Sequence, residues 1–424
     1  MTSKQVNPSA TWRGRAGEVV LLMVAPLMVL TALVAEAGRV TVTNVVATQR
    51  PYEPLVDITY DLLNPSGGVH TVLLHASTNS GATYSLSCTT FSGAVGVGVT
   101  TGANNQVVWF AAGDLAATST AFARVQVTAM EGTNNYCIID VAGGPDAANY
   151  PVSYQATAPP LDDTHKTSKI VLRKIPAGSF VMGSPTNELG RESDETQHTV
   201  TLTKDFYIGI YEITQAQYSN VMGANPSYFT QGTHAPTRPV EQVSWNMVRG
   251  GTWPGGTPTG TTFMGKLQSK TGLAFDLPTE AQWEYACRAS TTKALNNNTN
   301  LQNTEQDPNM DILGRYYYNG GSNYTNDAVN GGSAACGSYL VNQWGLYDMH
   351  GNAWEWCLDW YAAYSGDATD PEGPATTPVW PRRVIRGGAW IYEASSCRSA
   401  YRYLNTVDYA SSRYDFRVAL PAGQ

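Results

Sequence analysis

The stretch WGLYDMHGNAWEWCLDW, residues 344–360, decides how the second half of this 424-residue chain is interpreted. It combines four tryptophans with acids, an asparagine and the glycines Gly345 and Gly351. Large aromatic rings bury much apolar surface, while their N–H groups still need hydrogen-bond partners. We therefore expect a compact, irregular aromatic core that folds around tight turns at the two glycines. Where this backbone is extended, Trp354 and Trp356 share one face and the glutamate between them points to the other.

The same stretch resembles the central signature of the formylglycine-generating enzyme family, also called the sulfatase-modifying factor family. The resemblance implies an α+β domain with a C-type-lectin-like fold and little regular structure, over residues 169–424. Six further blocks resemble this family: FVMGS at 180–184, DFYIGIYEITQAQYSNVMGANPS at 205–227, PVEQVSW at 239–245, LPTEAQWEYACRA at 277–289, RVIRGGAW at 383–390 and FRVAL at 416–420.

The composition indicates two folded domains and excludes one class of partner. A chain of this length exceeds one ordinary core. Charged residues are 14%, and the chain holds 40 glycines and 23 prolines, which favours turn-rich structure over long helices. The net charge of −8 gives no reason to expect a nucleic-acid partner, whose phosphates require a basic face.

The first residues are typical of an export signal. The apolar run 19–34 follows two arginines and precedes the small-x-small cleavage pattern Ala35-Glu36-Ala37. The run is shorter than the ~20 residues of a spanning helix. We expect a signal peptide over residues 1–37 and no stable membrane span after cleavage; the alternative is an uncleaved anchor. The protein would then be extracellular, periplasmic or associated with the cell envelope.

Residues 38–152 have a different pattern. Apolar and polar residues alternate, as at Ile58, Tyr60 and Leu62, and turn clusters separate the runs. This pattern predicts an all-β immunoglobulin-like or fibronectin-like sandwich, which we interpret as a spacer or adhesion module. A polar, proline-bearing linker is expected over residues 153–168.

Three helices are predicted in the second domain. Capping-box patterns begin at Thr214 and Thr279, ahead of apolar residues at helical spacing. A third apolar stripe begins at Phe263 and ends near Gly272.

The central stretch also suggests a cation site. Carboxylates and backbone carbonyls in a turn suit a hard cation. The family resemblance implies a calcium ion held by the side chains of Asp348 and Glu355 and the carbonyls of Gly351 and Ala353. The alternative is that the two carboxylates accept backbone hydrogen bonds in a tight turn.

The copper site of the family is incomplete. The resemblance implies an oxidase that converts a sulfatase cysteine to formylglycine with two cysteines that hold copper(I). Those positions fall on Tyr392 and Cys397, so only one thiolate is present. A two-coordinate copper site needs both thiolates. We expect neither bound copper nor the family's oxidase activity.

Six cysteines are available for disulfides in an exported protein. The pairs we suggest are Cys88 with Cys137 and Cys357 with Cys397, among fifteen pairings that the sequence allows.

A segment rich in tyrosine and serine follows the last glycine pair. Tyrosine supplies rigid contact area and serine supplies hydrogen bonds in adaptable binding surfaces. The segment also resembles the variable region of retroelement-diversified proteins with this fold. The candidate binding residues are Trp390, Tyr392, Ser395, Ser396, Tyr401, Tyr403, Tyr409 and Tyr414.

The leading hypothesis is an exported, calcium-stabilised module that binds a protein or glycan ligand. One alternative is an oxidoreductase of the formylglycine-generating kind, or a related oxygen-using enzyme, acting on a sulfatase cysteine. Others are a retroelement-diversified binding protein and a structural component of the cell envelope.

Overall fold

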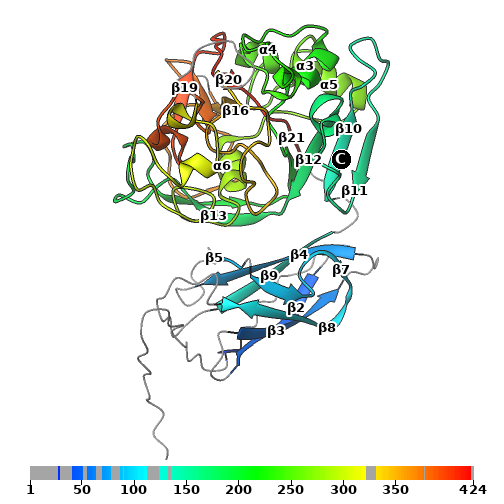
Figure 1. Cartoon of the computed structure of the whole chain (residues 1–424), viewed down its shortest axis with the longest axis vertical. Helices are drawn as coiled ribbons and strands as arrows, with labels where there is room; N and C mark the ends of the chain where they lie inside the picture. Colours follow the sequence, from blue (N-terminus) through cyan, green and yellow to red (C-terminus); the bar gives the residue numbers. More distant parts are fainter. Residues whose placement is uncertain are drawn as a thin grey trace, which may run out of the picture. The chain divides into compact units, whose positions relative to one another are not determined.

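The structure is a computed structural model with two compact units (Figure 1). The first comprises residues 1–67, 72–96 and 101–129, and the second comprises the remaining residues. Most of the expected signal peptide, residues 1–37, lies outside the described residues. The described residues are 27–28, 41–50, 55–63, 69–77, 86–88, 90–111, 124–131, 135–320, 331–376 and 378–421.

Strands make up nearly all of the described part of the first unit. The alternation predicted from the sequence is present, because Ile58, Tyr60 and Leu62 are buried. The immunoglobulin-like arrangement remains a prediction. One sheet has the order β1 (Leu27–Met28), β2 (Thr41–Gln49), β3 (Leu55–Leu63), β8 (Gly102–Phe110) and β6 (Phe91–Gly93). The other has the order β5 (Leu86–Ser87), β4 (Val69–Ser77) and β7 (Gly96–Thr100), with β9 (Arg124–Glu131) paired to β4.

The largest sheet of the second unit joins the two ends of the family-like region. Its last strand, β21, pairs antiparallel with β15 in the middle of the sequence. Every ladder in this sheet is antiparallel. The strand order is β11 (Val152–Gln155), β10 (Tyr136–Asp140), β12 (Lys169–Ile175), β15 (Phe206–Gly209) and β21 (Ala419–Pro421).

This sheet moves the expected domain boundary. The sequence placed residues 136–152 in the first domain and residues 153–168 in a linker. Instead, β10 and β11 pair with each other and β10 pairs with β12, so both belong to the second unit. The short helix α2 (Thr164–Thr167) also lies within the expected linker. A buried strand has the same local pattern in either domain, and only its pairing partners assign it.

Two smaller sheets are also present in the second unit, and one of them contains the end of the central stretch 344–360. The expectation of irregular structure is correct for residues 344–353, where Gly345 and Gly351 have φ of 82° and 81°. It is wrong for the following residues, which form strand β16. One sheet has the order β13 (Gly178–Met182), β14 (His198–Leu202) and β17 (Ala368–Thr369). The other has the order β19 (Tyr403–Asn405), β18 (Arg383–Arg386), β16 (Trp354–Trp360) and β20 (Tyr414–Asp415).

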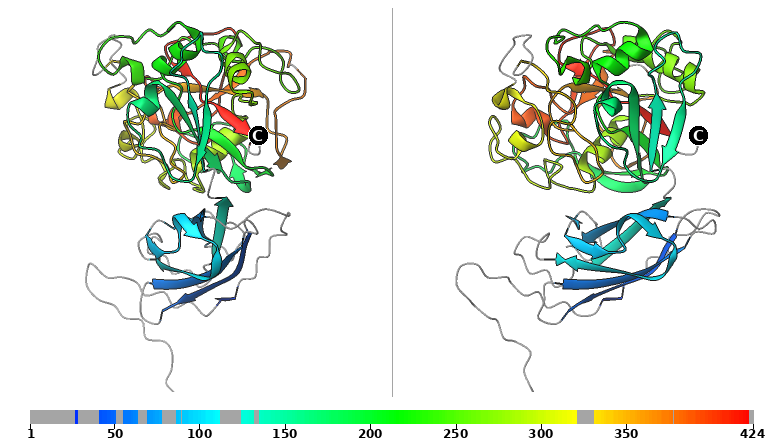
Figure 2. Two further views of the ribbon diagram at one scale, coloured as in Figure 1. Left: turned by 90° about the vertical axis from the view of Figure 1, so that its right-hand side faces the viewer. Right: turned by 45° about the vertical axis from the view of Figure 1, so that its right-hand side comes forward.

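The three predicted helices are confirmed. Helix α3 (Gln215–Met222) and helix α6 (Glu280–Arg288) each begin with a complete capping box. Helix α5 (Phe263–Thr271) ends at Gly272, which has φ of 74°. Helices α3 and α5 gather with the short α4 (Trp245–Val248) at one side of the second unit (Figures 1 and 2). Among the described residues, no helix has the length and apolar character of a membrane span.

Two core tryptophans direct their ring N–H groups to backbone carbonyls. Trp356 donates to the carbonyl of Val243 over 3.0 Å, and Trp245 donates to the carbonyl of Cys357 over 3.1 Å. Both indoles are fully buried in one apolar cluster. These bonds satisfy the polar atom of each ring, so the rings bury their surface without an unpaired donor.

Buried arginine–carboxylate pairs link distant segments. Arg398 contacts Glu188 over 2.7 Å and both oxygens of Glu195 over 2.7 and 2.8 Å. None of these three side chains is more than 2% exposed. A buried carboxylate that loses its cation keeps its desolvation penalty without the compensating attraction. The other buried pairs of this kind are Arg386–Glu284, Arg402–Glu280 and Arg417–Glu355.

We predict that Arg398→Met lowers the free energy of unfolding by about 3–5 kcal/mol, because it leaves Glu195 buried without its cation. Urea denaturation of the full chain measures this loss. The exposed Lys204, changed to Met, serves as a control with an expected change within about 0.5 kcal/mol. Equal stability of the Arg398 variant and the control would contradict the prediction.

Glu241 is a buried acid with incomplete hydrogen bonding. One carboxylate oxygen accepts from the backbone N–H of Phe229 over 2.7 Å, and the other is buried without a hydrogen bond. Burial raises the pKa of Glu241 from 4.5 to about 7. Between pH 4.5 and about 7, the folded state therefore keeps a proton on Glu241 that the unfolded chain has released. The stability that this bound proton contributes is fully present below about pH 4.5 and is lost as the pH rises through about 7.

We predict that Glu241→Gln makes stability less dependent on pH. The amide does not titrate, so between pH 4.5 and 8 the variant should lose less stability than the wild type, by up to about 3 kcal/mol. Urea midpoints at several pH values for both proteins provide the measurement. Parallel pH profiles would show that Glu241 does not titrate in this range.

Candidate functional site

The turn before β16 directs polar side chains into the protein. The Asn342 side chain accepts from the N–H groups of Trp344 and Leu346 over 2.9 and 3.0 Å, which fixes the start of the turn. Asp348 and Asn352 then adopt left-handed φ values of 58° and 63°. Short polar residues tolerate this conformation better than others do. The turn therefore places a carboxylate and an amide in a buried interior.

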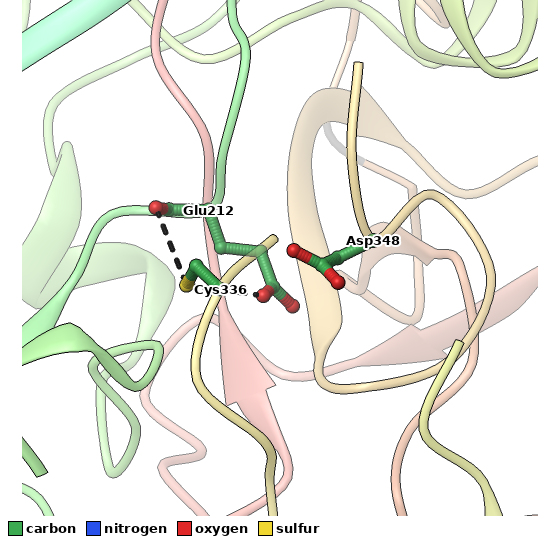
Figure 3. A group of neighbouring side chains, drawn as sticks. All are labelled: Glu212, Cys336 and Asp348. Carbon is green, nitrogen blue, oxygen red and sulfur yellow. Dashed lines mark hydrogen bonds between the residues drawn. The ribbon is translucent and has the colours of Figure 1, made fainter. Parts of the chain in front are cut away.

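Glu212 lies between β15 and α3, and its side chain contacts this turn. Its carboxylate accepts from the backbone N–H of Ala353 over 3.0 Å and from the side-chain amide of Asn352. The thiol of Cys336 lies 3.6 Å from the same carboxylate (Figure 3). Asp348 points toward Glu212 and accepts from the N–H of Gly337 over 2.6 Å. Three segments far apart in the sequence thus meet at one buried point.

The calcium set expected from the sequence fits this geometry only in part. Asp348 fits, because its Oδ1 is buried without a hydrogen bond. Glu355 does not fit, because Arg417 donates to both of its oxygens over 2.6 Å and the Trp283 ring N–H donates over 2.8 Å. A guanidinium already neutralises this carboxylate. Gly351 and Ala353 lie in the turn as expected, but the two acidic members do not share one open position.

The acids near Glu212 are held in a low-dielectric interior. Burial, followed by the negative charges of Asp348 and Glu355, raises the pKa of Glu212 well above its usual value. Burial raises the pKa of Asp348 to about 6. Burial and the charge of Glu212 raise the pKa of Asp415, whose two carboxylate oxygens form no hydrogen bond among the described residues. The cluster is therefore short of positive charge.

Cys397, at the second copper position, lies in an apolar core. Its side chain is fully buried in a cluster with Leu295, Leu313 and Tyr316. A Cβ placed on Gly388 would lie 2.5 Å from the sulfur, so the backbone approaches the thiol closely. Burial raises the pKa of the Cys397 thiol to about 12. The sulfur therefore stays protonated at neutral pH and is shielded from solvent.

The disulfides suggested from the sequence are not formed. Cys137, Cys357 and Cys397 are free thiols, so neither Cys88–Cys137 nor Cys357–Cys397 is a bridge. Cys137 lies on β10 in the second unit, and the expected domain boundary had wrongly placed it beside Cys88. Cys357 is on strand β16, whereas Cys397 ends a short turn of helix in another apolar cluster.

Tyr392, at the first copper position, belongs to an aromatic group around Trp354. The ring of Tyr392 meets Trp354 edge-on at 5.4 Å, and Tyr403 stacks on Trp354 at 5.4 Å. Tyr401 lies 5.8 Å from the same indole. The three tyrosines are half-buried and Trp354 is fully buried beneath them. We call Tyr392, Tyr401 and Tyr403 the tyrosine cluster.

Arg413 borders the tyrosine cluster. Its guanidinium donates to the hydroxyl of Tyr392 over 3.1 Å and to that of Tyr409 over 3.4 Å. Tyr409 is 39% exposed, so the cluster reaches solvent on this side. Ser395 and Ser396 are also partly exposed, as expected for a surface.

Two residues of the expected binding surface are buried instead. Trp390 donates its ring N–H to the carbonyl of Ser412 over 2.9 Å and packs edge-on against Phe229. Tyr414 is 1% exposed, accepts from the Asn405 amide over 2.9 Å and packs against Trp356. Composition alone does not distinguish a core aromatic residue from a surface one.

Sequence reasoning missed Glu212, Cys336 and Asp415 as members of the acidic cluster. Glu212 lies in a block that resembles the family, but nothing in its neighbours marks it as a partner of Asp348. Cys336 lies in a loop between glycines and carries no spacing signal.

A separate hollow of about 360 Å³ lies elsewhere, at β10 and β11, with His165 and Lys169 in its lining.

Comparisons with known proteins agree with the fold. The family described as "Sulfatase-modifying factor enzyme 1-like domain" matches residues 155–422. The formylglycine-generating enzyme of Bos taurus is 28% identical over 322 residues, which cover 66% of this chain and 82% of the relative. Chaperone protein LppX of Paenibacillus barcinonensis is 30% identical over 239 residues, which cover 50% and 78%.

Among solved structures, Treponema denticola variable protein 1 is similar, with 25% identity and a TM-score of 0.47. The match covers 59% of this chain and 95% of that protein. The family match spans more than half of the chain and includes the turn, β16 and the tyrosine cluster. The chain therefore belongs to the sulfatase-modifying factor family, which confirms the resemblance seen in its sequence.

Proposed function

We propose that the family domain of this protein is a ligand-binding module without the copper oxidase activity, and that the tyrosine cluster with Arg413 is its contact surface. The observation that supports this most is the side chain at the first copper position. Tyr392 packs on Trp354 and accepts from Arg413 there. A phenol held in this way supplies no thiolate for copper(I).

The position of Cys397 supports the same conclusion. A copper ligand must lose its proton, and an apolar environment opposes this. The thiols of Cys287, Cys336 and Cys357 lie against other groups: the Ser399 hydroxyl, the Glu212 carboxylate and the backbone of Glu355. Cys397 is therefore proposed as a core residue.

The tyrosine cluster has the chemical character of a contact surface. Half-buried tyrosines present an apolar ring and a hydroxyl and lose little conformational entropy on binding. Arg413 adds a cation whose fork can pair with a carboxylate or stack on a ring. The ligand class proposed is an exposed protein segment or a glycan. A relative named as a chaperone protein supports a binding role for a member of this family.

We propose export on the basis of the apolar run 19–34 and the cleavage pattern after it. The protein and its ligand would then both be located outside the cytoplasmic membrane.

We predict no copper-dependent oxygen uptake. The full chain, titrated with copper(I) and supplied with a cysteine-containing sulfatase peptide, should consume oxygen no faster than its Cys397→Ser variant. A two-cysteine member of the family serves as the positive control in the same electrode assay. Uptake that disappears in the Cys397 variant would contradict the proposal and favour the oxidoreductase.

We predict that binding depends on the tyrosine cluster. Ligands selected with the wild type from a displayed peptide library and a glycan array should bind at least tenfold more weakly to Tyr392→Ser/Tyr403→Ser, because central tyrosines dominate such contacts. Surface plasmon resonance measures the affinities, and thermal unfolding confirms that the variant is folded. The control is Tyr317→Ser, an exposed tyrosine outside the cluster.

Selection of no ligand by the wild type would contradict a binding role and favour a structural one. Selected ligands that bind the cluster variant and the control equally would place the contact surface elsewhere.

A further inference from the structure

Glu212, Cys336 and Asp348 bring two carboxylates and a thiol together in the interior. One oxygen of each acid and the sulfur lie within 4.8 Å of one another. Donor atoms of one metal ion are roughly 3 to 4.5 Å apart, because metal–oxygen and metal–sulfur bonds are about 2.0–2.3 Å long. A small closure of the three side chains would therefore bring them to a shared ion (Figure 3).

Asp348 provides an independent indication of a ligand. This residue is 1% exposed, and its Oδ1 has no hydrogen-bond partner within the described part of the chain, although its Oδ2 accepts from Gly337. The side chain points toward Glu212 (Figure 3). Folded proteins rarely leave a buried polar atom unpaired unless a water molecule or an ion binds it or the atom has a functional role. The carboxylate with this unpaired oxygen therefore faces the other acid across the point where the thiol of Cys336 also lies.

The hydrogen bonds of Glu212 leave it able to bind a metal. It accepts from the N–H of Ala353 and from the Asn352 amide. An ionised carboxylate has about four lone-pair positions, so two hydrogen bonds orient the group without saturating it. Such hydrogen bonds to a ligand residue hold it in place for the ion.

We propose that Glu212, Cys336 and Asp348 bind one divalent metal ion of borderline softness, of the Zn²⁺ class. The sulfur decides the class, because a thiolate favours zinc-like ions over calcium. The proposed site differs from the calcium set expected from the sequence: it shares Asp348, but replaces Glu355 with Glu212 and adds Cys336. It does not depend on the tyrosine cluster and goes beyond the proposed binding function.

Metal binding at this site displaces protons into the solvent. The Cys336 thiol gives up its proton and forms a sulfur–metal bond, and Glu212 and Asp348 release any proton they hold and bind as anions. Without a metal, this thiol lies 3.6 Å from a carboxylate oxygen of Glu212. Since the ligands come from the segment after β15, the loop before residue 344 and the turn at 348, the ion would also connect three parts of the fold.

The test uses the full chain, stripped with a chelator and dialysed against Zn²⁺, Ca²⁺ or Co²⁺. We expect one equivalent of Zn²⁺ by elemental analysis, no comparable uptake of Ca²⁺, and a cobalt spectrum with a thiolate-to-metal charge-transfer band. Cys336→Val should lose this band and bind Zn²⁺ at least tenfold more weakly.

Cys287→Ala is the matched control. Cys287 is a fully buried thiol in the same domain, and among the described residues its hydrogen-bond contacts are the Ser399 hydroxyl, the Met349 carbonyl and the His350 ring rather than a carboxylate. Its variant should keep the band and the zinc affinity. If Cys336→Val does not fold, Cys336→Ser replaces it and should also lose the band, because only a bound thiolate produces it.

Three outcomes would overturn the proposal. If the chain binds Ca²⁺ and its cobalt form lacks the thiolate band, the position binds a hard ion through oxygen atoms alone. Zinc binding that is unchanged in Cys336→Val would place the ion elsewhere, and the absence of any stoichiometric metal would mean that protons neutralise the cluster.

Discussion

The buried ion pair between Arg417 and Glu355 is the interaction on which the second domain depends. The guanidinium donates to both carboxylate oxygens over 2.6 Å, to the carbonyl of Gly209 over 2.9 Å and to that of Tyr347 over 3.1 Å. One side chain thus connects the end of β15, the central turn and β16. Trp283 adds helix α6 by donating to the same carboxylate. Such a pair forms only when all four segments are in place, so it links their folding.

The same ion pair determines which acids remain available to bind a cation. Arg417 neutralises Glu355, whereas Glu212, Asp348 and Asp415 form no ion pair among the described residues. A cation in this region would meet Glu212 and Asp348 rather than Glu355. Cys336 then gives the position a sulfur donor, which changes the kind of ion that suits it.

The two positions that correspond to the family's copper-binding cysteines lie in two different environments. Tyr392 joins a half-buried aromatic surface, whereas Cys397 lies in an apolar cluster with Leu295 and Leu313. Tyr392 is thus half-buried beside other aromatic rings, and Cys397 fills the core. The turn and strands of the family are present, while one thiol stands where the family has two.

Local sequence patterns are sufficient to predict the family, the capped helices and the alternating strands. Thr214 and Thr279 begin helices since a side-chain oxygen and a nearby N–H are neighbours in the chain. The burial of Trp390 and Tyr414, the pairing of β10 with β12 and the contact of Glu212 with Asp348 become visible only in the folded chain. These facts depend on contacts between residues far apart in the sequence, and no local pattern of hydrophobicity or spacing records which distant partner a side chain will have.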